Sequence, residues 1–237
     1  MNPKDRLIVA LDVETEEKAI SLVERLKNDV RFFKVGFELF ISCGPNIIEK
    51  IKETDCEIFL DLKFHDIPNT VSRAAISAVR LGVFMFNVHA LGGYDMMKEA
   101  VDATGTEATR SGERKPKILA VTILTSMDEK ALKKVGISDN IQTQVLKLAG
   151  LAKDAGLDGV VASPHEVKSI RKAFGKDFLI VTPGIRPTWA VSGDQKRIAT
   201  PKNALDAGAD FIVIGRPITE AKDPVFAAKD ILKELEI

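Results

Sequence analysis

The chain has 237 residues, 45% of them hydrophobic, which suits one large domain with a substantial core. Its 34 basic and 34 acidic residues balance, so the charge gives no reason to expect nucleic acid or an anionic membrane as a partner. The sequence has no apolar run long enough to span a bilayer and no signal-peptide-like start, and Cys43 and Cys56 form no disulfide framework. We therefore expect a soluble cytoplasmic protein.

Short apolar runs rich in β-branched residues alternate along the chain with segments of helical periodicity. The predicted strands are residues 7–11, 32–35, 57–62, 84–89, 118–124, 159–162, 179–182 and 211–214. The predicted helices are residues 16–26, 38–52 (interrupted at Cys43-Gly44-Pro45), 71–81, 94–104, 141–155, 164–174, 202–207 and 224–235. The polar stretch 106–115 is expected to be a surface loop before the fifth strand.

This alternation argues for a parallel sheet, and eight repeats in a chain of this length match a single-domain (β/α)8 barrel, a TIM barrel, over residues 1–237. An open doubly wound sheet is the alternative. Such sheets usually have fewer strands, and the Gly-x-Gly-x-x-Gly fingerprint is missing after the first predicted strand.

The end of the third predicted strand carries an unusual group of charges. Side chains alternate along a strand, so Asp61 and Lys63 share one face, and Asp66 adds a carboxylate just beyond. Burying charges is unfavourable unless they are paired. A lysine between two carboxylates should stay protonated, which suits a proton donor. Taken alone, the segment is equally explained by a structural ion pair under a loop.

Polar residues also follow the other predicted strands, and active sites of this barrel lie at the C-terminal strand ends. They are Asp12, Lys34, Asn87 to His89, Thr125 and Ser126, Ser163 to His165, Pro183 to Arg186, and Gly215 to Pro217. A group with two lysines, two arginines and three aspartates, converging at one end of a barrel, predicts a functional site.

The last two strand ends suggest an anion site. Gly215 permits close approach of a ligand to the backbone, and Pro217 fits the start of a helix. Phosphate sites of this barrel often use the loops after strands seven and eight, where Arg186 and Arg216 supply forked donors. The long connection 186–200, with Trp189, Gly193 and Gln195, is expected to be a functional lid rather than a surface insertion.

Together these segments resemble the orotidine 5'-monophosphate decarboxylase family, in its compact bacterial-type form, over essentially the full chain. The matching segments are Leu11-Asp12, Lys34-Val35-Gly36, Asp61-Leu62-Lys63-Phe64-His65-Asp66-Ile67-Pro68-Asn69-Thr70, Leu124-Thr125-Ser126, Thr182-Pro183-Gly184-Ile185-Arg186, Asp194-Gln195 and Ile214-Gly215-Arg216-Pro217. The third is highly specific, and the others occur in the family's order.

The resemblance implies decarboxylation of orotidine monophosphate to uridine monophosphate, the last step of de novo pyrimidine synthesis, with no metal and no organic cofactor. It assigns a charged catalytic network to Lys34, Asp61, Lys63 and Asp66, with Lys63 protonating C6 and Asp61 against the departing carboxylate. It assigns Asp12 and Lys34, with Thr70, to the ribose hydroxyls, and Thr125 and Ser126 to the base pocket. Arg186, Gln195, Gly215 and Arg216 would hold the phosphate and close the lid, and Asp61, Ile67 and Pro183 complete the implied substrate-binding residues. It also implies a homodimer in which Asp66, Ile67 and Thr70 reach the neighbouring site.

Two other readings are open. Metal-dependent sugar-phosphate lyases, resembling 3-keto-gulonate-6-phosphate decarboxylase or hexulose-phosphate synthase, share the Asp-x-Lys-x-x-Asp arrangement but place a magnesium-binding glutamate on the second strand. Here Lys34 holds that position, which argues against them. A non-catalytic phosphate-ligand sensor would explain the arginines but leave the Asp61, Lys63 and Asp66 cluster without a purpose.

Overall fold

A computed structural model describes residues 2–190 and 199–236 and confirms the predicted barrel. Eight parallel strands pair in chain order, and β1 closes the ring against β8. The strands are β1 (Leu7–Ala10), β2 (Phe32–Gly36), β3 (Glu57–Phe64), β4 (Met85–His89), β5 (Lys117–Val121), β6 (Gly159–Val161), β7 (Leu179–Thr182) and β8 (Phe211–Ile214). Each pair of neighbours is parallel, so all eight C-terminal ends meet at one mouth of the barrel.

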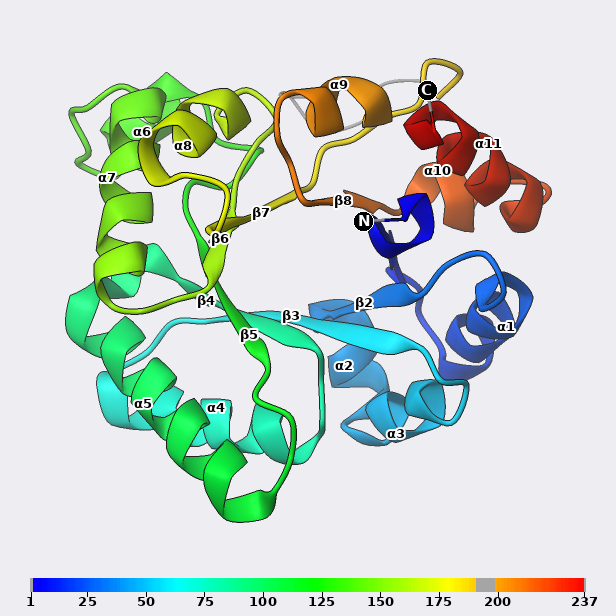
Figure 1. Cartoon of the computed structure of the whole chain (residues 1–237), viewed down its shortest axis with the longest axis horizontal. Coiled ribbons are helices and arrows are strands. Elements are labelled where there is room, and N and C mark those ends of the chain that lie inside the picture. Colours follow the sequence, from blue (N-terminus) through cyan, green and yellow to red (C-terminus); the bar gives the residue numbers. More distant parts are fainter. Residues whose placement is uncertain (1, 191–198, 237) are drawn as a thin grey trace.

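Helices lie outside the ring of strands (Figure 1). They are α1 (Glu16–Leu26), α2 (Phe37–Cys43), α3 (Asn46–Lys52), α4 (Pro68–Arg80), α5 (Gly93–Ser111), α6 (Glu129–Lys134), α7 (Ile141–Asp154), α8 (Val167–Phe174), α9 (Pro201–Asp206), α10 (Arg216–Thr219) and α11 (Pro224–Glu236), with 3₁₀ turns η1 (Pro3–Asp5) and η2 (Ala90–Gly92). The predicted interruption at Gly44 and Pro45 separates α2 from α3. Among the described residues, no helix combines the length and apolar character needed to cross a bilayer.

Local sequence signals explain several helix starts. The side chain of Thr15 accepts a hydrogen bond from the Lys18 amide at the start of α1, and Asn140 does the same for the Thr143 amide at α7. At α9, the Thr200 hydroxyl caps the helix, and Pro201 occupies a position where its missing N–H is not needed. These capping interactions fix the residues at which α1, α7 and α9 begin.

The barrel is filled with side chains rather than hollow. Its interior holds an apolar cluster made of Ile8, Ala10, Phe32, Phe59, Met85, Leu119, Val181, Phe211 and Val213. A larger cluster lies between the strands and the surrounding helices. Because the strands are covered on both faces, their sequences read as continuous apolar runs. The filled interior leaves the C-terminal mouth as the place for a cavity.

The predicted loop 106–115 is wrong over most of its length. Helix α5 continues to Ser111 and ends at Gly112, whose φ of +73° is the left-handed conformation typical of a helix C-cap. Buried Glu107 pairs with Arg80 of α4 and with Arg110, which lowers the pKa of its carboxyl to about 2, chiefly through hydrogen bonds from Arg110 and Arg80. These ion pairs hold the polar turn in the helix.

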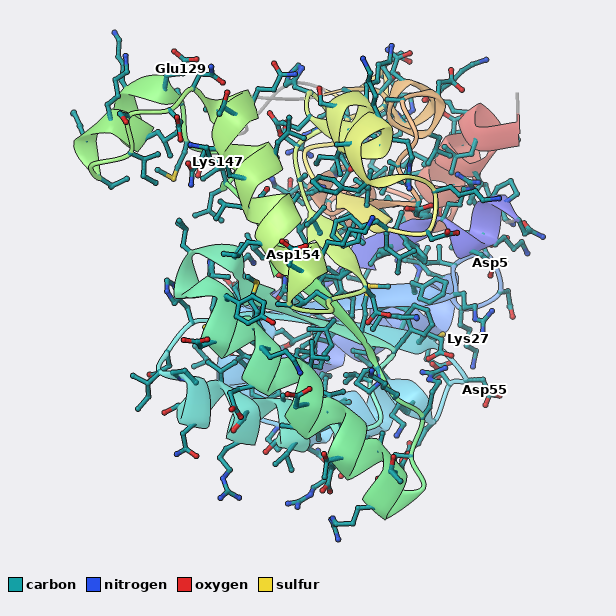
Figure 2. All side chains as sticks on the ribbon, turned by 60° about the vertical axis from the view of Figure 1, so that its left-hand side comes forward. Asp5, Lys27, Asp55, Glu129, Lys147 and Asp154 are labelled. Atoms are coloured by element: carbon teal, nitrogen blue, oxygen red, sulfur yellow. The ribbon has the colours of Figure 1, made fainter. Side chains whose placement is uncertain are left out.

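The fifth strand was also predicted too long, because β5 ends at Val121 and residues 122–126 form a loop. The short helix α6 was not predicted, whereas α10 begins at Arg216 and Pro217, where the sequence indicated a helix start. Figure 2 shows the molecule from the side: Asp5, Lys27 and Asp55, which precede β1, β2 and β3, lie together on one edge, while Glu129 of α6, which follows β5, lies on the opposite edge. The loops that build the site described next belong to the same end as α6.

Candidate active site

A cavity of about 490 Å³ opens at the C-terminal ends of the strands. Its apolar floor includes Ala10, Phe59 and Val213, which also belong to the cluster inside the barrel. The predicted site residues that line it are Asp12, Lys34, Asp61, Lys63, Thr125, Pro183, Arg186, Gly215 and Arg216. The structure thus brings together residues from six of the eight strand ends.

One side of the cavity is a chain of alternating charges. Lys34 Nζ lies 2.8 Å from Asp12 Oδ1 and 3.2 Å from Asp61 Oδ2. Asp61 Oδ1 lies 2.7 Å from Lys63 Nζ. The sequence placed Asp61 and Lys63 side by side, and the structure confirms the contact and extends it through Lys34 to Asp12. The four groups therefore act as one electrostatic unit.

The two central groups of this chain are buried and fully charged. Burial lowers the pKa of Lys34, but the carboxylates of Asp61 and Asp12 outweigh it, so the pKa of Lys34 is raised. Burial raises the pKa of Asp61, but Lys34 and Lys63 outweigh it together with a hydrogen bond from Asn87, so its pKa is lowered. An aspartate kept anionic beside two ammonium groups gives the cavity a fixed pattern of charge.

The backbone at the end of β3 is irregular. Lys63 adopts φ of +43°, in the left-handed region that residues other than glycine rarely occupy. The pairing register between β3 and β4 shifts between Leu60 and Phe64, which marks a β-bulge. Simple alternation predicted the neighbourhood of Asp61 and Lys63 but not this bulge. Bulges and strained backbone of this kind gather beside functional sites.

Gly36, the last residue of β2, leaves space for the ion pair between Lys34 and Asp12. A Cβ atom at this position would lie 2.9 Å from Lys34 Nζ and 3.4 Å from Asp12 Oδ1. Any larger residue would therefore displace the ammonium group from its carboxylate. The Lys34-Val35-Gly36 segment is thus explained by the geometry of the Lys34–Asp12 ion pair.

The opposite side of the cavity carries the predicted anion-binding residues. Arg186 is buried, and Arg216 begins α10 directly after Gly215. A Cβ atom at Gly215 would meet Ala10 Cβ at 3.4 Å and Asp12 Oδ2 at 3.6 Å, and both are ordinary contact distances. The absence of a side chain at this position leaves room for a ligand to approach the backbone. Gln195 and Gly193 lie outside the described residues.

Four predicted residues lie outside the cavity lining. Asp66, Ile67, Thr70 and Ser126 are exposed, and the Asp66 carboxylate accepts a hydrogen bond from the Ile67 amide at 2.7 Å. Within the described residues of one chain, Lys63 forms an ion pair with Asp61 and none with Asp66. The expectation that Lys63 lies between two carboxylates is therefore not met by a single chain.

The structure adds residues that the sequence did not single out. Glu38 and Glu220 line the cavity, and the ring of Phe37 lies 5.6 Å from Lys63 Nζ. Phe37 and Glu38 directly follow Gly36 in the first turn of α2. Their position directly after the end of β2 was the signal that could have identified them, since the segments that follow the C-terminal strand ends line the site.

Comparison with known proteins agrees with the fold. Residues 5–231 match the orotidine 5'-phosphate decarboxylase / HUMPS family. The orotidine 5'-phosphate decarboxylase of Syntrophotalea carbinolica is 53% identical over 98% of this chain and 95% of its own length, and that of Syntrophomonas wolfei is 51% identical over the whole of both chains. The solved structure of orotidine 5'-phosphate decarboxylase from Lactobacillus acidophilus is 45% identical, with a TM-score of 0.87 over 98% of this chain and all of that one.

Proposed function

Because the chain belongs to the orotidine 5'-phosphate decarboxylase / HUMPS family, we infer that the cavity converts orotidine monophosphate to uridine monophosphate, the last step of UMP synthesis. The enzyme is an orotidine 5'-phosphate decarboxylase. The strongest support for this function is the row of alternating carboxylate and ammonium groups, from Asp12 through Lys34 and Asp61 to Lys63, which lines the cavity.

Lys34 argues against the metal-dependent branch of this family. Its ammonium group lies within ion-pair distance of both Asp12 and Asp61. A divalent cation held by Asp12 and Asp61 would have to occupy the space that the Lys34 ammonium group already fills, and the two positive charges would repel each other strongly at so short a distance. The charge pattern therefore supports a reaction in which side-chain ammonium groups, rather than a metal ion, stabilise the developing negative charge.

The chemistry requires a cation at the reacting carbon. When the bond between C6 and the carboxyl carbon breaks, carbon dioxide leaves and the electron pair stays on C6. The ammonium group of Lys63 stabilises that pair and donates a proton to form the C6–H bond. Lys63 then regains a proton from solvent. Asp61 holds the ammonium group at 2.7 Å and keeps it oriented.

Other residues are assigned to binding of the nucleotide. Arg186, Gly215 and Arg216 of the cavity are assigned to the phosphate together with Gln195, and Pro183 also contacts the substrate. Asp12 and Lys34 are assigned to the ribose hydroxyls with Thr70, and Thr125 is assigned to the base with Ser126, the next residue in the chain, which lies outside the cavity lining. Binding energy from a phosphate remote from the reacting carbon can hold the substrate in the reactive position.

A homodimer in a cytoplasmic location completes the proposal. Asp66, Ile67 and Thr70 are exposed around the start of α4, and Ile67 leaves 65% of its surface uncovered. A second subunit covering this segment would bury the Ile67 side chain and account for a site residue that its own cavity does not use. Asp66 would then supply its carboxylate to the partner's Lys63 network.

The test is direct. Purified protein mixed with orotidine monophosphate in EDTA is expected to show the absorbance loss of decarboxylation at an undiminished rate. Activity that disappears in EDTA and returns with magnesium would favour the metal-dependent lyases instead. Tight binding of uridine monophosphate with no turnover of orotidine monophosphate would support the sensor.

A further inference from the structure

Asn87 lies on β4 opposite the point where β3 leaves its regular pairing. Leu60 pairs with Phe86 and Phe64 pairs with Val88, so three residues of β3 face Asn87 across the gap. The side chain of Asn87 is fully buried. A buried amide at a break in the sheet must have its hydrogen bonds satisfied from within the protein.

The Asn87 amide joins both parts of the Asp61–Lys63 unit. Its Oδ1 accepts a hydrogen bond of 2.7 Å from the backbone N–H of Lys63. Its Nδ2 donates one of 2.6 Å to Asp61 Oδ1, the same oxygen that accepts from Lys63 Nζ. Only a side chain that both donates and accepts can make this pair of bonds. The amide thus replaces the ladder bond that the bulge removes from Lys63.

We propose that Asn87 is a positioning residue for decarboxylation, an inference that rests on the proposed function. Its amide holds Lys63 in the left-handed backbone conformation that directs the ammonium group into the cavity, and it fixes the rotamer of the Asp61 carboxylate. Without it, the Lys63 N–H loses its acceptor, the bulge relaxes and the ammonium group moves away from C6. Asn87 does not itself touch the substrate.

The first experiment replaces Asn87 by alanine and separates kcat from KM for orotidine monophosphate. We expect kcat to fall on the order of 10²-fold, because small displacements of a catalytic group have effects of this size. KM should change less than about 3-fold, because the arginines across the cavity stay in place. Thr104→Val is the matched control: Thr104 is equally buried and donates a hydrogen bond to the Ala100 carbonyl inside α5, a helix that contributes no residue to the cavity lining.

The second experiment uses Asn87→Asp, which keeps the shape and the acceptor but donates to Asp61 only when protonated. Two carboxylates this close share one proton, which raises the pKa of the pair. The rate of this variant relative to the unaltered enzyme should therefore rise as pH falls from 8 to 5. The surrounding groups Lys34, Lys63, His65 and His89 are the same in both proteins, so the ratio reports the new carboxyl group.

The outcomes distinguish failure of the proposed function from failure of the positioning role of Asn87. If the unaltered enzyme does not decarboxylate orotidine monophosphate, the proposed function fails. If it does, and folded Asn87→Ala keeps kcat within about 3-fold, the positioning role of Asn87 is overturned while the function stands. A pH-independent rate ratio for Asn87→Asp overturns it as well, and it decides the matter if the alanine variant does not fold.

Discussion

The two mouths of the barrel both carry charged side chains, but these charges rest on different surroundings. At the N-terminal mouth, Phe32, Phe84 and Phe211 pack with ring centroids 4.9 to 6.4 Å apart. Arg114 lies 5.1 Å above the Phe84 ring and donates two hydrogen bonds, of 2.7 and 2.6 Å, to Glu57. These charges cover a packed aromatic layer and stay in contact with water.

At the C-terminal mouth the surroundings of the charges are different. Lys34 and Asp61 are buried, and they face a cavity instead of a packed layer. Buried charges stabilise a fold poorly, because desolvation opposes their attraction, whereas a solvent-accessible cation over an aromatic ring is modestly favourable. The difference indicates that the N-terminal charges serve stability and the C-terminal charges serve chemistry. Substitutions at the N-terminal mouth should therefore change the free energy of unfolding, and substitutions at the C-terminal mouth should change kcat or KM.

The largest effect is expected for Lys63→Ala. Removing both the proton donor and the cation beside C6 should lower kcat at least about 10⁴-fold, while uridine monophosphate still binds. Steady-state kinetics and calorimetric binding measure the two quantities. Lys117→Ala, which removes a lysine paired with Asp158 at the other mouth, should leave kcat unchanged. Near-normal turnover by folded Lys63→Ala would remove Lys63 from the mechanism.

Next in size is Phe211→Ala at the N-terminal mouth. Truncating this buried ring should lower the free energy of unfolding by about 3–5 kcal/mol, because it leaves a cavity between Phe32 and Phe84. Phe211→Leu, which fills part of the space, should lower it less. Chemical denaturation measures both. We expect kcat of the folded variants to stay normal. A large fall in kcat of folded Phe211→Ala would show that the two mouths are coupled.

This division was largely predictable at the level of elements and strand ends. The apolar runs located all eight strands, and the alternation of side chains placed Lys63 beside Asp61. Both signals are local in the sequence, so they could be seen without the structure. The bulge and the positive φ of Lys63 were not predictable, since they depend on Asn87, which is 24 positions away along the chain. A conformation unfavourable for the residue itself leaves no local signal.

The missed end of α5 shows the same limit. Threonine and glycine are weak helix formers, so the stretch Thr104-Gly105-Thr106 reads as the end of a helix. In the structure, Thr104 bonds a carbonyl one turn back, and Glu107 pairs with Arg80 of α4. That pairing between helices outweighs the weak propensity. Gly112 was the visible stop signal, and it lay seven residues further on.

A smaller effect at the C-terminal mouth is expected for Arg216→Ala. A lost charged hydrogen bond to the phosphate should raise KM for orotidine monophosphate roughly 10- to 10²-fold. The effect should vanish with orotidine, which has no phosphate, so the comparison of the two substrates is the measurement. Arg114→Ala, an arginine of the other mouth, should change neither value. An equal rise in KM for both substrates would show that Arg216 does not act on the phosphate.

The smallest effect is expected for Glu57→Gln at the N-terminal mouth. Hydrogen bonds from Arg114 lower the pKa of Glu57 against the opposing effect of burial, so its ionised form stabilises the fold above the pKa of an unfolded glutamate, about 4.3, and this contribution is lost as pH falls further. The variant should be less stable by about 1 kcal/mol at pH 7, and the difference should shrink below pH 4. Denaturation at both pH values measures it. A difference that does not depend on pH would mean that Glu57 acts through packing rather than charge, and a change in kcat at pH 7 would mean that the two mouths are coupled.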